Sequence, residues 1–127
     1  MVRRHAILVA GLVLLASTLP LLAQSGPSSG PNGGLVAGAG HHKTELIVSP
    51  AELTVYLLED GKLHDSKGTA MRAVIQQAGK STTLDFADQD GKKLVAKLPA
   101  PLDKGAIVVL TGKDHHGDRF NARYVIQ

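Results

Sequence analysis

The chain has 127 residues, a formal net charge of +3 and no cysteine. Arg3 and Arg4 supply two of its 14 basic residues, so the remainder carries 12 Lys and Arg against 11 Asp and Glu, a net charge of +1. This near-neutral balance excludes a basic surface for nucleic acid. The lack of cysteine excludes disulfides, thiolate metal ligands and a thiol nucleophile.

The first 23 residues have the order of a secretory signal peptide. Arg3 and Arg4 precede an apolar stretch, Pro20 interrupts it, and Ala23 is the small residue before the expected cleavage site. An uncleaved membrane anchor is the alternative, because the apolar stretch approaches the length that spans a bilayer. Pro20 and the short basic start favour removal, so we predict an exported protein with no stable membrane insertion once residues 1–23 are gone.

Residues 24–40 contain six glycines, two prolines and three serines. Such a segment buries too little apolar surface to offset its ordering entropy, which predicts a flexible linker. Periodic hydrophobicity begins after it. We therefore expect one domain over residues 41–127, large enough for a single modest core.

The domain shows seven short segments with alternating apolar residues, separated by turn residues. On the second, Leu53, Val55 and Leu57 fall on one face. The third also has helical propensity, but its β-branched residues and the hairpin-like link at Gly79 favour a strand. The pattern predicts an all-β fold, a seven-stranded antiparallel immunoglobulin-like sandwich or small barrel. The segments are residues 45–48, 53–58, 69–77, 81–86, 93–98, 107–111 and 120–126, the last two forming a hairpin.

Five histidines remain after the signal peptide: His41, His42, His64, His115 and His116. If consecutive strands are antiparallel, the start of the first strand and the second, fourth and sixth loops lie at one end of the sandwich. The histidines occupy three of these positions, and Asp88 and Asp90 occupy the fourth loop. The topology therefore predicts that all five histidines share one end.

Imidazole and carboxylate without thiolate favour Cu(II), Zn(II) or Ni(II) over Cu(I). Adjacent histidines on an extended strand point to opposite faces, so each pair is expected to give one inward ligand. The alternative is that these histidines are solvated turn residues or weak, adventitious metal binders. Asp114, Gly117 and Asp118 are residues that a long hairpin turn needs for its backbone.

The sequence shows no catalytic constellation. Ser66 and Ser81 lack the elbow and oxyanion motifs of a serine nucleophile. The turn around Asp88 and Asp90 lacks the twelve-residue loop of a calcium hand. We therefore expect a non-enzymatic protein.

Residues 41–46, 53–62, 102–106 and 119–124 resemble segments of small exported proteins of Gram-negative bacteria encoded near heavy-metal efflux systems. The shared features are a His followed by Glu-Leu, a Leu-Thr-x-Tyr-Leu strand and a late Leu-x-Lys-Gly step. The resemblance implies a periplasmic β-sandwich. A metal role that it implies falls first on His41 and His42, while His115 and His116 lie where members vary.

Two functions follow as expectations. In the first, the sandwich binds or buffers a divalent transition metal, or assists a component of a metal-efflux system. In the second, it is a structural or protein-interaction module that docks an envelope protein through an edge strand, and it has no physiological metal.

Overall fold

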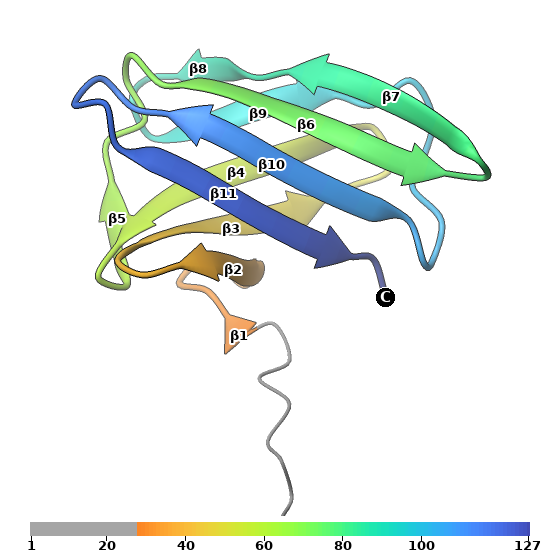
Figure 1. The fold of residues 1–127 in the computed structure, drawn as a ribbon, viewed down its shortest axis with the longest axis horizontal. Coiled ribbons are helices and arrows are strands. Elements are labelled where there is room, and N and C mark those ends of the chain that lie inside the picture. Colours follow the sequence, from red (N-terminus) through yellow and green to blue (C-terminus); the bar gives the residue numbers. More distant parts are fainter. Residues whose placement is uncertain (1–27) are drawn as a thin grey trace, which may run out of the picture.

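The computed structural model describes residues 28–127, which form two antiparallel β-sheets packed face to face (Figure 1). The predicted signal peptide lies outside the described residues. Within residues 28–127, no helix is long and apolar enough to cross a membrane.

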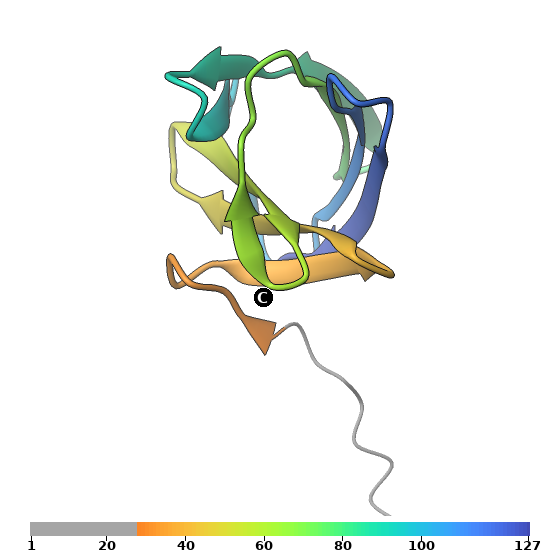
Figure 2. The same ribbon diagram turned by 90° about the vertical axis from the view of Figure 1, so that its left-hand side faces the viewer.

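One sheet has the strand order β1-β2-β3-β4-β9-β8, with β5 also paired to β4, and the other has the order β11-β10-β6-β7. Viewed along the strands, the two layers face each other across the core (Figure 2). The strands are β1 (Ser28–Ser29), β2 (Leu35–Ala39), β3 (His42–Val48), β4 (Glu52–Glu59), β5 (Lys62–His64), β6 (Ala70–Gln77), β7 (Lys80–Asp85), β8 (Ala87–Gln89), β9 (Lys93–Lys97), β10 (Ile107–Lys113) and β11 (Arg119–Val125).

The prediction of an all-β antiparallel sandwich is confirmed, and the two sheets do not close into a barrel. Each of the seven predicted segments corresponds to a strand, including the ambiguous third segment, which is β6. The predicted number was too low, because β1, β2, β5 and β8 are also present in the described residues.

Alternation along the strands places one apolar layer between the sheets. On β11, for example, every second residue is buried while the residues between them are exposed. Leu53, Val55 and Leu57 of β4 face this layer and are fully buried. Burial of such side chains contributes roughly 25 cal/mol per Å² of apolar surface and is the main favourable contribution to folding. The chain has no disulfide to add to it.

The short strand β5 exists because of a tight turn. Asp60 and Gly61 both have positive φ, as a two-residue type I′ hairpin requires. The chain therefore reverses at once, and Glu59 pairs with Lys62. The turn thus continues the sheet for three more residues beyond the predicted segment 53–58.

The predicted flexible linker is wrong for its described part, because β1 and β2 lie within it and β2 pairs with β3. The cause is Glu45, a fully buried carboxylate on β3. It accepts hydrogen bonds from the backbone N–H of Asn32 at 2.9 Å, from the Asn32 side-chain amide at 3.0 Å and from the backbone N–H of Gly34 at 2.8 Å. A Cβ on Gly34 would lie 2.8 Å from the Glu45 side chain, so this glycine permits close packing.

Tyr124 connects the two sheets. Its side chain is buried, and its hydroxyl donates to the backbone carbonyl of Thr44 on β3 at 2.6 Å. The Thr44 hydroxyl lies 2.7 Å from the Tyr124 hydroxyl oxygen. Burial raises the pKa of Tyr124 to about 12, an effect that the hydrogen bond to Thr44 opposes.

We predict that Glu45→Gln lowers the free energy of unfolding by about 1–3 kcal/mol, because an amide N–H₂ group then faces the backbone donors of residues 32–34. Chemical denaturation measures the loss, and hydrogen exchange should show faster exchange at Asn32 and Gly34. Glu52→Gln, at a half-buried position on β4, is the matched control. Equal losses in the two variants would contradict the role given to Glu45.

We predict that Tyr124→Phe lowers stability by about 1–3 kcal/mol at neutral pH, through loss of the hydrogen bond to Thr44. It should also change the alkaline limb of the stability curve. Because the folded pKa of about 12 exceeds the unfolded value of 10.0, this tyrosine's contribution is complete below pH 10 and declines by about 2–3 kcal/mol as pH rises to 12. Denaturation between pH 8 and 12 should therefore show a shallower decline in the variant; parallel curves would refute the assignment.

Candidate functional site

The loops that carry most of the histidines lie at one end of the sandwich, on the left of Figure 1. His64 ends β5, and the turn between β10 and β11 carries His115 and His116. The fourth loop lies beside them, since the backbone N–H of Ser66 donates to the carbonyl of Gly91 at 3.0 Å. These contacts agree with the alternation of loops expected from the sequence.

Asp114 organises the histidine-bearing turn. Its carboxylate is buried, and Oδ1 accepts the backbone N–H of His116 at 2.9 Å and of Asp118 at 2.8 Å. The Asp114 N–H in turn donates to the carbonyl of Asp118 at 3.0 Å. His115 and His116 thus lie on a compact turn and not on an extended strand. Their ring centroids are 3.9 Å apart, so the expectation that they point to opposite faces is wrong for this pair.

His64 lies between two carboxylates. Its Nε2 is 3.1 Å from Asp114 Oδ2, and its Nδ1 is 3.1 Å from Glu59 Oε2. Only Asp114 is fully buried, whereas the Glu59 side chain is half-exposed. The His64 ring is 6.5 Å from that of His115 and 6.3 Å from that of His116. Three imidazoles from two distant parts of the chain therefore lie side by side.

Phe120, which is fully buried on β11, packs against the rings of His64 and His42. Its centroid is 6.1 Å from that of His64 and 5.2 Å from that of His42, whose ring meets it edge-on. His42 Nε2 is 4.0 Å from Asp118 Oδ2. His42 Nδ1 is buried and has no hydrogen-bond partner in the part of the chain described.

His41 lies apart from this group. Its side chain is 79% exposed and pairs through Nδ1 with Asp60. Within residues 28–127, no ring contact joins His41 to another histidine. His41 and His42, at the start of β3, therefore point to different surroundings, as expected for adjacent residues of a strand.

The electrostatics favour an ionised Asp114. Burial by itself raises the pKa of this carboxyl, but the backbone N–H groups of Asp118 and His116 and the imidazole of His64 together hold the pKa below its ordinary value. Asp114 is therefore a fixed negative charge beside the His64 ring.

Sequence reasoning identified the histidines but missed three residues that position them: Glu59, Asp114 and Phe120. The sequence indicated only a turn role for Asp114, and it placed Phe120 only at the start of the predicted segment 120–126. The structure gives both assignments a second role, because the same side chains contact His64. In the described residues, no group of three or more His, Asp or Glu side chains is already arranged around a metal position.

Comparisons with known proteins identify no relative. The chain matches no protein-family model, no curated protein and no solved structure.

We predict that Asp114→Asn lowers the free energy of unfolding by about 1–3 kcal/mol, because the amide keeps the turn's acceptor oxygen but loses the charged partner of His64. Hydrogen exchange should show faster exchange in residues 114–118. Asp118→Asn, at a position whose side chain is 45% exposed, is the control and should stay within about 0.5 kcal/mol of wild type. An unchanged free energy of unfolding in Asp114→Asn would contradict the role of Asp114 in organising the turn.

Proposed function

We infer that the protein binds a divalent transition metal through His64, His115 and His116, at the histidine-bearing end of the sandwich. The observation that carries this inference is the gathering of three imidazoles, with centroids 3.9 to 6.5 Å apart, next to the buried carboxylate of Asp114. Imidazole and carboxylate donors suit Cu(II), Zn(II) or Ni(II).

The contacts of His64 resemble those of a metal-binding histidine. Such a residue donates one ring N–H to a carboxylate, which fixes the tautomer and leaves the other nitrogen for the metal. Here Nε2 lies 3.1 Å from Asp114 Oδ2, whose carboxylate accepts and so favours the proton on Nε2, and Nδ1 faces Glu59 at 3.1 Å. A metal at Nδ1 would take the place of a proton there, and the half-exposed Glu59 would be available as an additional oxygen ligand.

His115 and His116 would complete the ligand set by movement of their side chains. Both are exposed on the turn between β10 and β11, so rotation about χ1 and χ2 is not opposed by a packed core. Asp114 fixes the backbone of that turn through Oδ1 while holding His64 through Oδ2. One carboxylate thus supports all three imidazoles.

The wider role that fits this site is that of a non-enzymatic periplasmic protein which buffers the metal or assists a metal-efflux component. Its location rests on the predicted signal peptide, and its link to efflux rests on the sequence resemblance. A non-catalytic role fits the exposed, two-loop position of the histidines better than that of an enclosed reaction site.

The strand order supports an immunoglobulin-like connectivity. Of the seven strands expected from the sequence, the first, second and fifth (β3, β4 and β9) share one sheet, and the third, fourth, sixth and seventh (β6, β7, β10 and β11) share the other. This is the two-sheet Greek-key arrangement with the fourth strand in the second sheet.

Calorimetric titration of the full chain with Cu(II), Zn(II) and Ni(II) tests the metal site. We expect His64→Ala, and His115→Ala combined with His116→Ala, to weaken the best-bound metal by tenfold or more. Asp114→Asn, which changes no ligand, should weaken it by about 10- to 100-fold. His41→Ala is the matched histidine control and should leave affinity unchanged. Binding that is insensitive to His64, or that depends equally on His41, would refute the site.

A further inference from the structure

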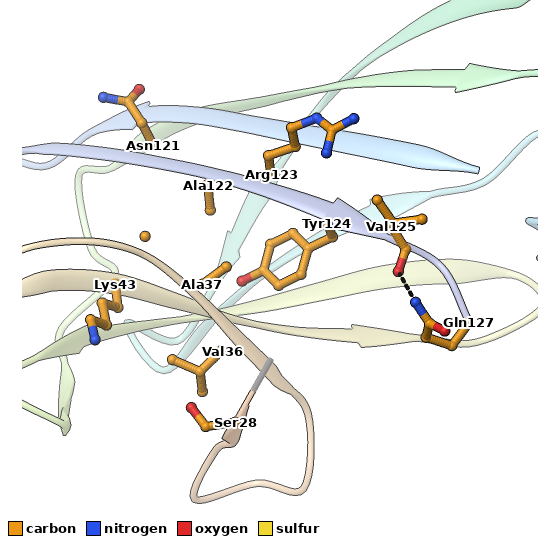
Figure 3. Close-up of a pocket in the computed structure, with 11 residues that line it drawn as sticks. Ser28, Val36, Ala37, Lys43, Asn121, Ala122, Arg123, Tyr124, Val125 and Gln127 are labelled. Atoms are coloured by element: carbon orange, nitrogen blue, oxygen red, sulfur yellow. Dashed lines mark hydrogen bonds between the residues drawn. The ribbon is translucent and has the colours of Figure 1, made fainter. Parts of the chain in front are cut away.

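A groove separates β11 from β2, at the side of the sandwich where the two sheets do not pair (Figure 3). Its volume is about 580 Å³, within the roughly 300–1,000 Å³ typical of ligand sites. The inner wall is formed by Ala37 of β2 and by Ala122 and Tyr124 of β11, whose side chains point into it in Figure 3. No histidine of the described residues lines it, and the proposed metal site does not use it.

The outer edge of β11 is open. Within residues 28–127, β11 is the last strand of its sheet and pairs only with β10. The backbone N–H of Ile126 donates to Ala106, on the β10 side, at 2.8 Å. Because N–H and C=O groups alternate between the two edges of a strand, those of Asn121 and Arg123 face the groove side. They are available to an added strand.

The charged side chains that line the groove are positive. Lys43 and Arg123 line the groove, no acidic side chain does, and Arg119 lies two positions further along the same exposed row as Asn121 and Arg123. A second copy of β11 would place Arg opposite Arg or Asn, so the charges oppose self-pairing. They favour a partner strand with acidic side chains.

We propose that the outer edge of β11 binds an extended acidic segment of a partner protein by β-strand addition. Successive side chains of the partner strand point to opposite faces, so the residues on its two faces differ in chemistry. Asp or Glu side chains lie beside Arg119 and Arg123 on the outer face, and small apolar side chains enter the groove beside Ala37, Ala122 and Tyr124. Backbone hydrogen bonds to Asn121 and Arg123 supply pairing, and the arginines select the sign of the charge.

Two synthetic peptides test this proposal on the full chain, with a chelator present so that metal plays no part. Each has about six residues, the common length of a strand, with blocked ends. One alternates Glu and Val, and the other alternates Lys and Val. Fluorescence anisotropy measures affinity, and amide chemical shifts locate the bound peptide. We expect the Glu-Val peptide to bind and to shift the amides of Asn121 and Arg123, and the Lys-Val peptide not to bind.

Asn121→Pro removes an N–H from the open edge while leaving the bonds to β10 intact, and proline is tolerated at a sheet edge. It should weaken binding of the Glu-Val peptide by about tenfold or more, whereas Asn121→Ala should not. Arg119→Glu combined with Arg123→Glu should reverse the preference toward the Lys-Val peptide. This reversal remains a test if the proline variant fails to fold, which circular dichroism would show.

The proposal is overturned if the Glu-Val peptide leaves the β11 amides unshifted. It is also overturned if a folded Asn121→Pro variant and Asn121→Ala bind that peptide equally, or if the charge reversal leaves the preference unchanged. None of these results depends on whether the histidine end binds a metal.

Discussion

The row of inward side chains on β11 is the constraint on which the molecule depends. Phe120, Ala122 and Tyr124 alternate with exposed residues and are all buried, so one strand contributes to the core along its whole length. At one end Phe120 packs against the rings of His42 and His64, and toward the other Tyr124 bonds to Thr44 across the sheets. With no disulfide to join the layers, this row connects the core, the candidate metal site and the groove.

Much of the fold could be predicted because it depends on local patterns. Alternation of apolar residues located seven of the strands, and the parity of antiparallel connections brought the loops of His64 and His115 together. The missed elements depend on contacts that a local pattern does not contain. Residues 28–40 are ordered by Glu45, which lies 13 residues from Asn32 and 11 from Gly34 in the sequence. The strands β5 and β8 have only three residues each, too few to show a period.

The sequence predicted which type of residue forms the candidate site, but it predicted the arrangement of those residues less well. Histidine spacing indicated a shared end but did not separate His41, which pairs with Asp60, from the three rings that gather. Nor did it show that Asp114 contacts His64, because turn-forming and ring-positioning carboxylates look the same in a sequence. One aspartate fills both roles here, since each of its two oxygens has a different set of partners.

The burial of Glu45 also bears on where the folded unit can be divided. A protein shortened to begin at residue 41, where hydrophobic periodicity starts, would retain this carboxylate without the N–H donors of Asn32 and Gly34. It would also lose β2, leaving the flank of β3 unpaired and open to association with other chains. Residues 28–40 are thus an integral part of the sandwich, and small residues such as Gly34 allow them to pack closely against Glu45.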